Sequence, residues 1–217
     1  MSRIALPLET ARLRIRPMSE ADATDLHELY SDRDAMKYLT SRPPTTVEES
    51  LAWVRQKMQL QEAEGLSLWS IVEKASGHVI GDCGLQYEDE ARTELGLAFR
   101  LRRASWHQGL AFEASAACLR AGFEQLGVDR IVGITHEDNF AAQRLMLRLG
   151  MEFLEQRTWA GMPMVVHVTT DASRSPSEPN GSDQTARRAP GSITFTPFTR
   201  SHRASPTSAA KLTTSPG

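Results

Sequence analysis

The sequence contains only two cysteines, no long apolar run and no strong excess of one charge. Cys83 and Cys118 form no CxxC motif, so we expect buried thiols in a reducing compartment rather than a disulfide scaffold. No apolar run approaches the length of a membrane span, and the N-terminus lacks the apolar core of a signal peptide. These absences predict a soluble, cytoplasmic protein with no membrane contact.

Several binding signatures are also missing. The net charge of −2 gives no general reason to expect nucleic acid as a partner. The six histidines show no metal-ligand spacing, so no metal cofactor is expected. Neither a GxxxxGK(S/T) loop nor a GxGxxG fingerprint occurs, which weighs against the nucleotide-binding folds that use them.

The composition changes sharply near Thr169, and this change sets the domain boundary. Residues 170–217 are dominated by Ser, Thr, Pro, Gly, Ala and Arg, so they cannot bury enough apolar surface to offset chain entropy. We expect this tail to be disordered, and its scattered basic residues are typical of a solvated linker. Residues 1–169 then form a single domain.

Within that domain the apolar pattern alternates between strands and helices. Leu95, Leu97, Phe99 and Leu101 alternate with period two, as in a half-buried strand. The same reasoning predicts strands over 12–16, 66–72, 78–86, 95–101, 130–135, 153–159 and 164–168. Helical spacing follows Ser19, Thr46, Gly109 and Asn139. Helices mixed with antiparallel hairpins indicate an α+β fold around one central sheet.

The stretch "WHQGLAFEA", residues 106–114, joins the strand 95–101 to a long amphipathic helix. A helix N-terminus leaves its first N–H groups unpaired and carries partial positive charge, so it suits an anionic group. Gly109 and Ala111 keep side chains small where a phosphate would approach. Taken alone, the pattern fits an ordinary helix start as well as a phosphate cradle.

A second motif downstream makes the pattern more specific. Asn139, Arg144 and Gly150 have the spacing of the Asn-x-x-Ser-x-Arg-x-x-x-x-x-Gly helix motif, with Ala142 in place of the serine. Trp106-x-x-Gly109-x-Ala111 fits the pattern (Gln/Arg)-x-x-Gly-x-(Gly/Ala) at Gly109 and Ala111, and Trp106 departs from its first position. With both motifs, the chain resembles the GNAT superfamily of acyl-CoA-dependent N-acetyltransferases. It most resembles the branch that includes the ribosomal-protein N-terminal alanine acetyltransferases.

The resemblance covers residues 8–168 and implies a GNAT fold. That fold is a mixed, mostly antiparallel seven-stranded sheet flanked by about four helices. The strands 95–101 and 130–135 would splay apart and hold acetyl-CoA in the gap. The backbone of the cradle would bind the pyrophosphate, the strand 95–101 would pair with the pantetheine arm, and Asn139 would hydrogen-bond that arm. Arg144 would reach the nucleotide phosphates or, equally, form a surface ion pair. The implied acetyl-CoA contacts are Phe99, Arg100, Leu101, Trp106, His107, Gln108, Gly109, Leu110, Ala111, Phe112, Asn139 and Arg144.

Catalysis requires a group that takes a proton from the amine. Many relatives use a glutamate on the strand before the phosphate loop, and Glu94 is the nearest candidate here. The usual pattern places that glutamate at Gly96, two residues beyond Glu94 on the same strand face. The alternative is that Glu94 is a solvated carboxylate at a strand start. Neither Met146 nor Ala142 supplies the tyrosine or serine that relatives use as a general acid, so the thiolate would leave unaided or take a proton from water.

Energetics bear on the acceptor. Deprotonating a lysine amine at pH 7 costs roughly 4.6 kcal/mol, whereas a protein α-amine costs only about 1–1.4 kcal/mol. A site with no visible acid is therefore better suited to an α-amine or another weakly basic amine than to a lysine. The resemblance implies acetyl transfer to a primary amine, a peptide N-terminus or a small molecule, by direct attack in a ternary complex. The alternative is an acyl-CoA-binding GNAT module with little or no catalysis. We expect a monomer or a homodimer, and an acidic turn at residues 88–90 that either attracts a cationic substrate or is merely solvated.

Overall fold

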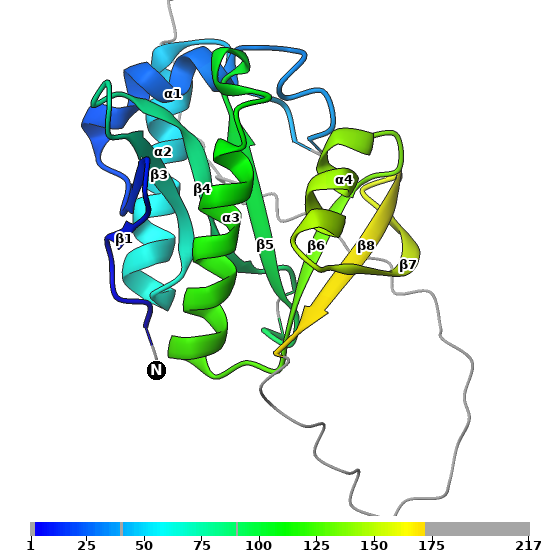
Figure 1. The fold of residues 1–217 in the computed structure, drawn as a ribbon. Coiled ribbons are helices and arrows are strands. Elements are labelled where there is room, and N and C mark those ends of the chain that lie inside the picture. The colour runs from blue at the N-terminus through cyan, green and yellow to red at the C-terminus, as the bar shows by residue number, and fades with distance from the viewer. Residues whose placement is uncertain (1–2, 40, 90, 172–217) are drawn as a thin grey trace, which may run out of the picture. The chain divides into compact units, whose positions relative to one another are not determined.

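The computed structural model describes residues 3–39, 41–89 and 91–171 (Figure 1). These residues belong to one compact unit, and a second unit, Gln184–Gly217, lies outside the described residues. The predicted tail also lies outside them, apart from its first two residues. The last strand extends through Thr170, so the regular structure reaches the predicted domain boundary.

An eight-stranded sheet forms the centre of the domain, in the order β1-β2-β3-β4-β5-β6-β8-β7. Neighbouring strands are antiparallel except for β5 and β6, which are parallel. The strands are β1 (Leu8–Glu9), β2 (Leu13–Arg16), β3 (Ser67–Glu73), β4 (Val79–Tyr87), β5 (Leu95–Leu101), β6 (Arg130–His136), β7 (Glu152–Trp159) and β8 (Met162–Thr170). The predicted α+β class and mixed sheet are confirmed. The strand missing from the prediction is β1, whose two residues are too few to show an alternating pattern.

Four α-helices cover the sheet. They are α1 (Ala23–Tyr30), α2 (Val47–Glu64), α3 (Leu110–Ala121) and α4 (Phe140–Arg148). The Thr46 hydroxyl accepts a hydrogen bond from Glu49 N at 3.2 Å and caps α2, which ends at Gly65 in the left-handed conformation. One apolar cluster packs α3 and Met146 of α4 against one face of the sheet. A second cluster packs α1 and α2 against the other face.

The feature that positions the site is the junction of β5 and β6. β5 pairs with β4 over its whole length, from Leu95 to Leu101. Among the described residues, β6 pairs with β5 at Gly96 and Val132 alone. Beyond this point the two strands diverge, as Figure 1 shows. The predicted parting of these strands is thus confirmed.

Candidate active site

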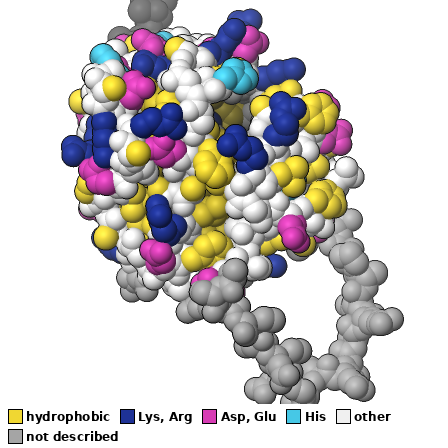
Figure 2. All heavy atoms as spheres, in the orientation of Figure 1, with side chains coloured by type: hydrophobic (Ala, Val, Ile, Leu, Met, Phe, Trp, Pro, Cys, Tyr) yellow, Lys and Arg dark blue, Asp and Glu magenta, His cyan; other side chains and the backbone are white. Residues whose placement is uncertain are grey.

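A cleft of about 1010 Å³ opens where β5 and β6 part. Its walls come from β5, from the N-terminal end of α3, from α4, from α2 on the other side of the sheet, and from the segment between α1 and α2. Figure 2 shows apolar side chains down the middle of this face, with Lys and Arg side chains on both sides. The wall residues used below are Trp53, Lys57, Gln86, Ala98, Phe99, Arg100, Leu101, Trp106, His107, Gly109, Leu110, Ala111, Phe112, Asn139 and Arg148.

At one end of the cleft lies the N-terminus of α3. Gly109 caps this helix with φ 77°, a left-handed conformation that favours glycine. The first helical hydrogen bond runs from Glu113 N to Gly109 O at 3.1 Å, so the preceding N–H groups have no acceptor within the helix. A Cβ built on Gly109 would approach only Arg12 Nη2, at 3.6 Å. Leu110, Ala111 and Phe112, which carry these N–H groups, line the cleft, so an anion in the cleft can approach them.

The loop before α3 is held from both sides. The Trp106 indole N–H donates to Leu101 O at 2.7 Å, which ties the loop to the end of β5. Arg12 Nη1 donates to Gln108 O at 2.8 Å, and the Arg12 guanidinium pairs with Glu113 at 2.7 Å. Trp106 thus has a structural partner where relatives carry Gln or Arg. The Gln108 side chain donates to Ala104 O at 2.9 Å and lies outside the cleft wall.

The edge of β5 forms the middle of the cleft. Its residues Phe99, Arg100 and Leu101 all line the wall, as the resemblance implied. Because β6 has already diverged, the backbone groups on this edge are available to an extended ligand arm, in the manner of strand addition, apart from Leu101 O, which accepts from Trp106. The Arg100 side chain is engaged elsewhere, in a bidentate pair with the fully buried Asp82 at 2.8 Å for both bonds. Tyr30 donates to the same carboxylate at 2.6 Å.

The two residues predicted on α4 take different positions. Asn139 lines the cleft and caps α4, with Oδ1 accepting from Ala142 N at 3.3 Å and Nδ2 donating to Thr135 Oγ1 at 2.9 Å. Arg144 is exposed and lies outside the cleft wall. The sequence reasoning missed Arg148, which does line the cleft and stacks over the Phe112 ring at 4.9 Å. Arg148 lies four residues after Arg144 on the same helix, so the two positions are neighbours on the helix surface. This spacing is the sequence signal that could have indicated Arg148.

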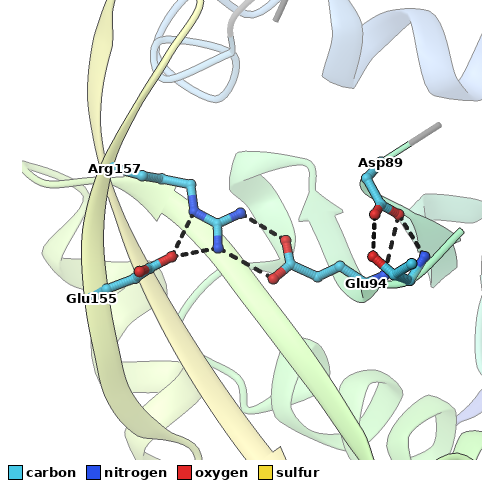
Figure 3. A network of polar contacts seen from close by, with 5 residues as sticks. Asp89, Glu94, Glu155 and Arg157 are labelled. Atoms are coloured by element: carbon cyan, nitrogen blue, oxygen red, sulfur yellow. Dashed lines mark hydrogen bonds and ion pairs between the residues drawn. The ribbon is translucent and has the colours of Figure 1, made fainter. Parts of the chain in front are cut away.

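Glu94 faces β7 rather than the cleft. Figure 3 shows its carboxylate against the Arg157 guanidinium, with bonds of 2.7 and 3.2 Å. Arg157 also pairs with Glu155 at 2.6 Å, and these bonds raise the pKa of Arg157. Glu94 is not among the residues that line the cleft. Its assignment as the base stays a prediction, and it would require the carboxylate to exchange Arg157 for an amine or a water.

The α2 side of the cleft carries a partly buried lysine that the sequence did not single out. Lys57 of α2 lines the cleft and donates to Gln86 Oε1 at 3.3 Å. Burial lowers the pKa of Lys57, and the Arg100 guanidinium lowers it further, whereas Asp82 and Glu88 raise it.

No group of three or more potential metal ligands occurs among the described residues. No helix in that part of the chain is long and apolar enough to cross a membrane.

A parted pair of parallel strands with a helix N-terminus at one end is the arrangement that the resemblance to the GNAT superfamily implied. The chain belongs to the acetyltransferase (GNAT) family, whose domain matches residues 12–152. The predicted superfamily and fold are thereby confirmed, and the protein is an acetyltransferase of the N-acetyltransferase class.

Curated relatives cover most of the domain, and solved structures share its fold. The uncharacterized YkkB of Bacillus subtilis is 30% identical over 165 residues, which cover 74% of this chain and 93% of YkkB. The uncharacterized N-acetyltransferase YoaA of Bacillus subtilis is 25% identical over 146 residues, covering 67% of this chain and 82% of YoaA. A GNAT-family acetyltransferase from Bacillus anthracis has a TM-score of 0.68 at 19% identity, covering 76% of this chain and 98% of that one. The ribosomal-protein α-N-acetyltransferase RimL, solved in complex with coenzyme A, has a TM-score of 0.66 at 15% identity, covering 76% and 98%.

Proposed function

We propose that the cleft binds acetyl-CoA and that the protein transfers the acetyl group to a primary amine by direct attack in a ternary complex. The acceptor is a peptide N-terminus or a small-molecule amine. The observation that carries this proposal is the single pairing between β5 and β6, which leaves a strand edge leading to the open N-terminus of α3. Acetyl-CoA supplies an activated thioester, and the residues of the chain bind and orient the reactants.

The cleft residues fit such a co-substrate from end to end. The N–H groups after Gly109 would hold the pyrophosphate, since the residues that carry them line the cleft and the helix dipole favours anions. The edge of β5 at Phe99 and Leu101 would align the pantetheine arm toward Gly96. Asn139 would add a hydrogen bond through the amide capacity that its two internal bonds leave unused. Arg148, over the Phe112 ring, would attract the phosphates.

The amine would then enter from the side of the sheet that carries α2. The thioester arm fills the gap between β5 and β6, which leaves the wall formed by Trp53, Lys57 and Gln86 for the acceptor. RimL is named for acetylation of a ribosomal-protein α-amine. An α-amine also costs less to deprotonate than a lysine side chain, by roughly 3 kcal/mol at pH 7. A peptide N-terminus is therefore the acceptor that we favour.

The test is release of free thiol from acetyl-CoA in the presence of peptides that begin with alanine or serine, of free amino acids and of spermidine. Matched peptides with a blocked N-terminus are the control. Binding is followed in parallel by thermal unfolding, where a hundredfold excess over Kd stabilises the folded state by about 2.7 kcal/mol. Turnover on an unblocked amine supports the proposal. Stabilisation by acetyl-CoA without turnover on any amine would instead favour the acyl-CoA-binding module.

A further inference from the structure

Gly96 occupies the position at which the parting of the sheet begins. It lies opposite Gln86 of β4 on one side and opposite Val132 of β6 on the other. A Cβ built on Gly96 would lie 2.2 Å from Glu88 Oε1, and the next two nearest atoms also belong to the Glu88 side chain. The carboxyl group of Glu88 therefore fills the space that a side chain at position 96 would take.

That space lies on the acceptor side of the sheet. Strand side chains alternate, so position 96 shares a face with Ala98 and Arg100. Ala98 packs against the cluster formed by α1 and α2, and both residues line the cleft. Glu88 is held over this face by its backbone, because its N–H donates to Glu94 O at 2.9 Å and closes the connection between β4 and β5.

The groups around Glu88 come from four elements. Gln86 of β4 hydrogen-bonds its carboxyl, Lys57 approaches from α2, Glu94 from the start of β5 and Arg157 from β7. Burial raises the pKa of Glu88 to about 7, and the Glu94 carboxylate adds to the rise. The Gln86 hydrogen bond, Lys57 and Arg157 act in the opposite direction without cancelling the effect of burial. The carboxyl is thus able to exchange a proton near neutral pH.

We propose that Glu88 is the general base of the acetyl transfer and that it acts from the space vacated at Gly96. This inference rests on the proposed function. The Glu88 carboxylate accepts a proton from the acceptor ammonium through one bridging water. The freed lone pair of the amine forms the N–C bond to the acetyl carbonyl carbon, and the C–S bond breaks. The thiolate takes a proton from solvent, the amide nitrogen loses its second proton to water, and Glu88 is deprotonated again by solvent.

Two glutamates compete for this role, and they differ in their partners. Glu94 is bound through both oxygens to Arg157, a pair that favours the charged carboxylate and turns it toward β7 (Figure 3). Neither carboxylate belongs to the cleft wall, but Glu88 lies next to Gln86, which does line the cleft beside Lys57. In this arrangement Glu94 is a positioning residue: it holds Arg157 and, through its backbone carbonyl, the Glu88 backbone.

The experiment compares Glu88→Gln, Glu94→Gln and the exposed control Glu152→Gln, with acetyl-CoA and the best acceptor among alanine peptides, serine peptides and spermidine. Glu88→Gln is expected to lower kcat/KM on the order of 10²-fold and to remove the limb of the pH profile with its midpoint near 7. The affinity for acetyl-CoA should stay unchanged. The ionisation of the amine itself appears in every variant, so the comparison between variants isolates the protein group.

Two further variants separate a proton acceptor from a structural role. Gly96→Ala is expected to lower kcat/KM because the added Cβ displaces the Glu88 carboxyl. The double variant Glu88→Ala with Gly96→Glu returns a carboxylate to the same space and is expected to recover the limb of the pH profile. If Glu88 had only a structural role, the double variant would still lack this limb of the pH profile.

Retention of full activity and of the pH limb in Glu88→Gln would overturn the inference, as would loss of the limb in Glu94→Gln alone. Wild-type protein that binds acetyl-CoA and acetylates no amine would instead contradict the proposed function. In that case the Glu88 carboxyl is titrated by ¹³C NMR, with Glu88→Gln to assign its signal. A midpoint near 4.5 would then overturn the role of Glu88, and a midpoint near 7 would support the environment on which it depends.

Discussion

Replacing Glu88 with glutamine is expected to stabilise the unliganded protein at pH 8 and to leave its stability at pH 4 almost unchanged. Burial raises the pKa of Glu88 from 4.5 to about 7 on folding, so the native state binds this proton more tightly than the unfolded state does. The free energy of unfolding therefore falls as the pH rises between these two values. At about 1.4 kcal/mol per pKa unit, this loss of stability has an upper limit of about 3.5 kcal/mol, which solvent at the partly exposed carboxylate reduces.

The measurement is urea unfolding followed by tryptophan fluorescence at several pH values from 4 to 8. Wild type, Glu88→Gln and the exposed control Glu152→Gln are compared under identical conditions. Glutamine resembles the neutral carboxyl group, so Glu88→Gln should remove the pH-dependent loss while Glu152→Gln keeps it. A Glu88→Gln protein that is no more stable than wild type at pH 8 would refute the argument. So would a difference from wild type that is the same at every pH.

Three other changes have expected outcomes. Gly109→Ala and the control Gly150→Ala both place a side chain at positive φ, so each should cost about 1 kcal/mol of stability in thermal unfolding. Gly109→Ala alone should raise the Kd for acetyl-CoA tenfold or more. Equal Kd values for the two variants would contradict the phosphate cradle. Asp82→Asn leaves the Arg100 cation without its buried counter-ion and should lower the free energy of unfolding in urea by about 3–5 kcal/mol. A loss below 1 kcal/mol would show that the pair is not buried in solution. Hydrogen bonds lower the pKa of Glu113 although burial raises it, so Glu113→Gln should destabilise the protein by about 1–2 kcal/mol at pH 7. This difference should shrink as the pH falls below 4.5, and a pH-independent difference would contradict the assignment.

Local patterns were sufficient to predict most of the fold. The alternating leucines of β5 and the small residues at the start of α3 each reflect a local requirement, strand burial in one case and a close approach of backbone in the other. The two-residue strand β1 has no such pattern, because its formation depends on pairing with β2. The sequence could therefore predict the cleft and its cradle, but not the extra strand at the edge of the sheet.

Side-chain partners between distant residues were beyond the reach of local patterns. The pairing of Glu94 with Arg157 joins residues 63 positions apart, and it depends on where β7 lies relative to the start of β5. The approach of Glu88 to Gly96 depends on the turn between β4 and β5, which sequence spacing alone left as a solvated or substrate-attracting acidic turn. The missing side chain at Gly96 was visible in the sequence. That the Glu88 carboxyl fills this space could not be predicted from the sequence, because it depends on the register between β4 and β5.

Among the described residues, the pairing of Gly96 with Val132 is the one strand pairing that joins two parts of the sheet, although one apolar cluster packs against both parts. On one side stand β1 to β5 with α1, α2 and α3, and on the other stand β6 to β8 with α4. An extended ligand arm lying along the edge of β5 would join these two parts of the sheet, because it would supply the backbone contacts that β6 does not make. The co-substrate would then be a part of the sheet while it is bound. Amide hydrogen exchange in β5 and β6 should slow on binding even at residues that never touch the ligand.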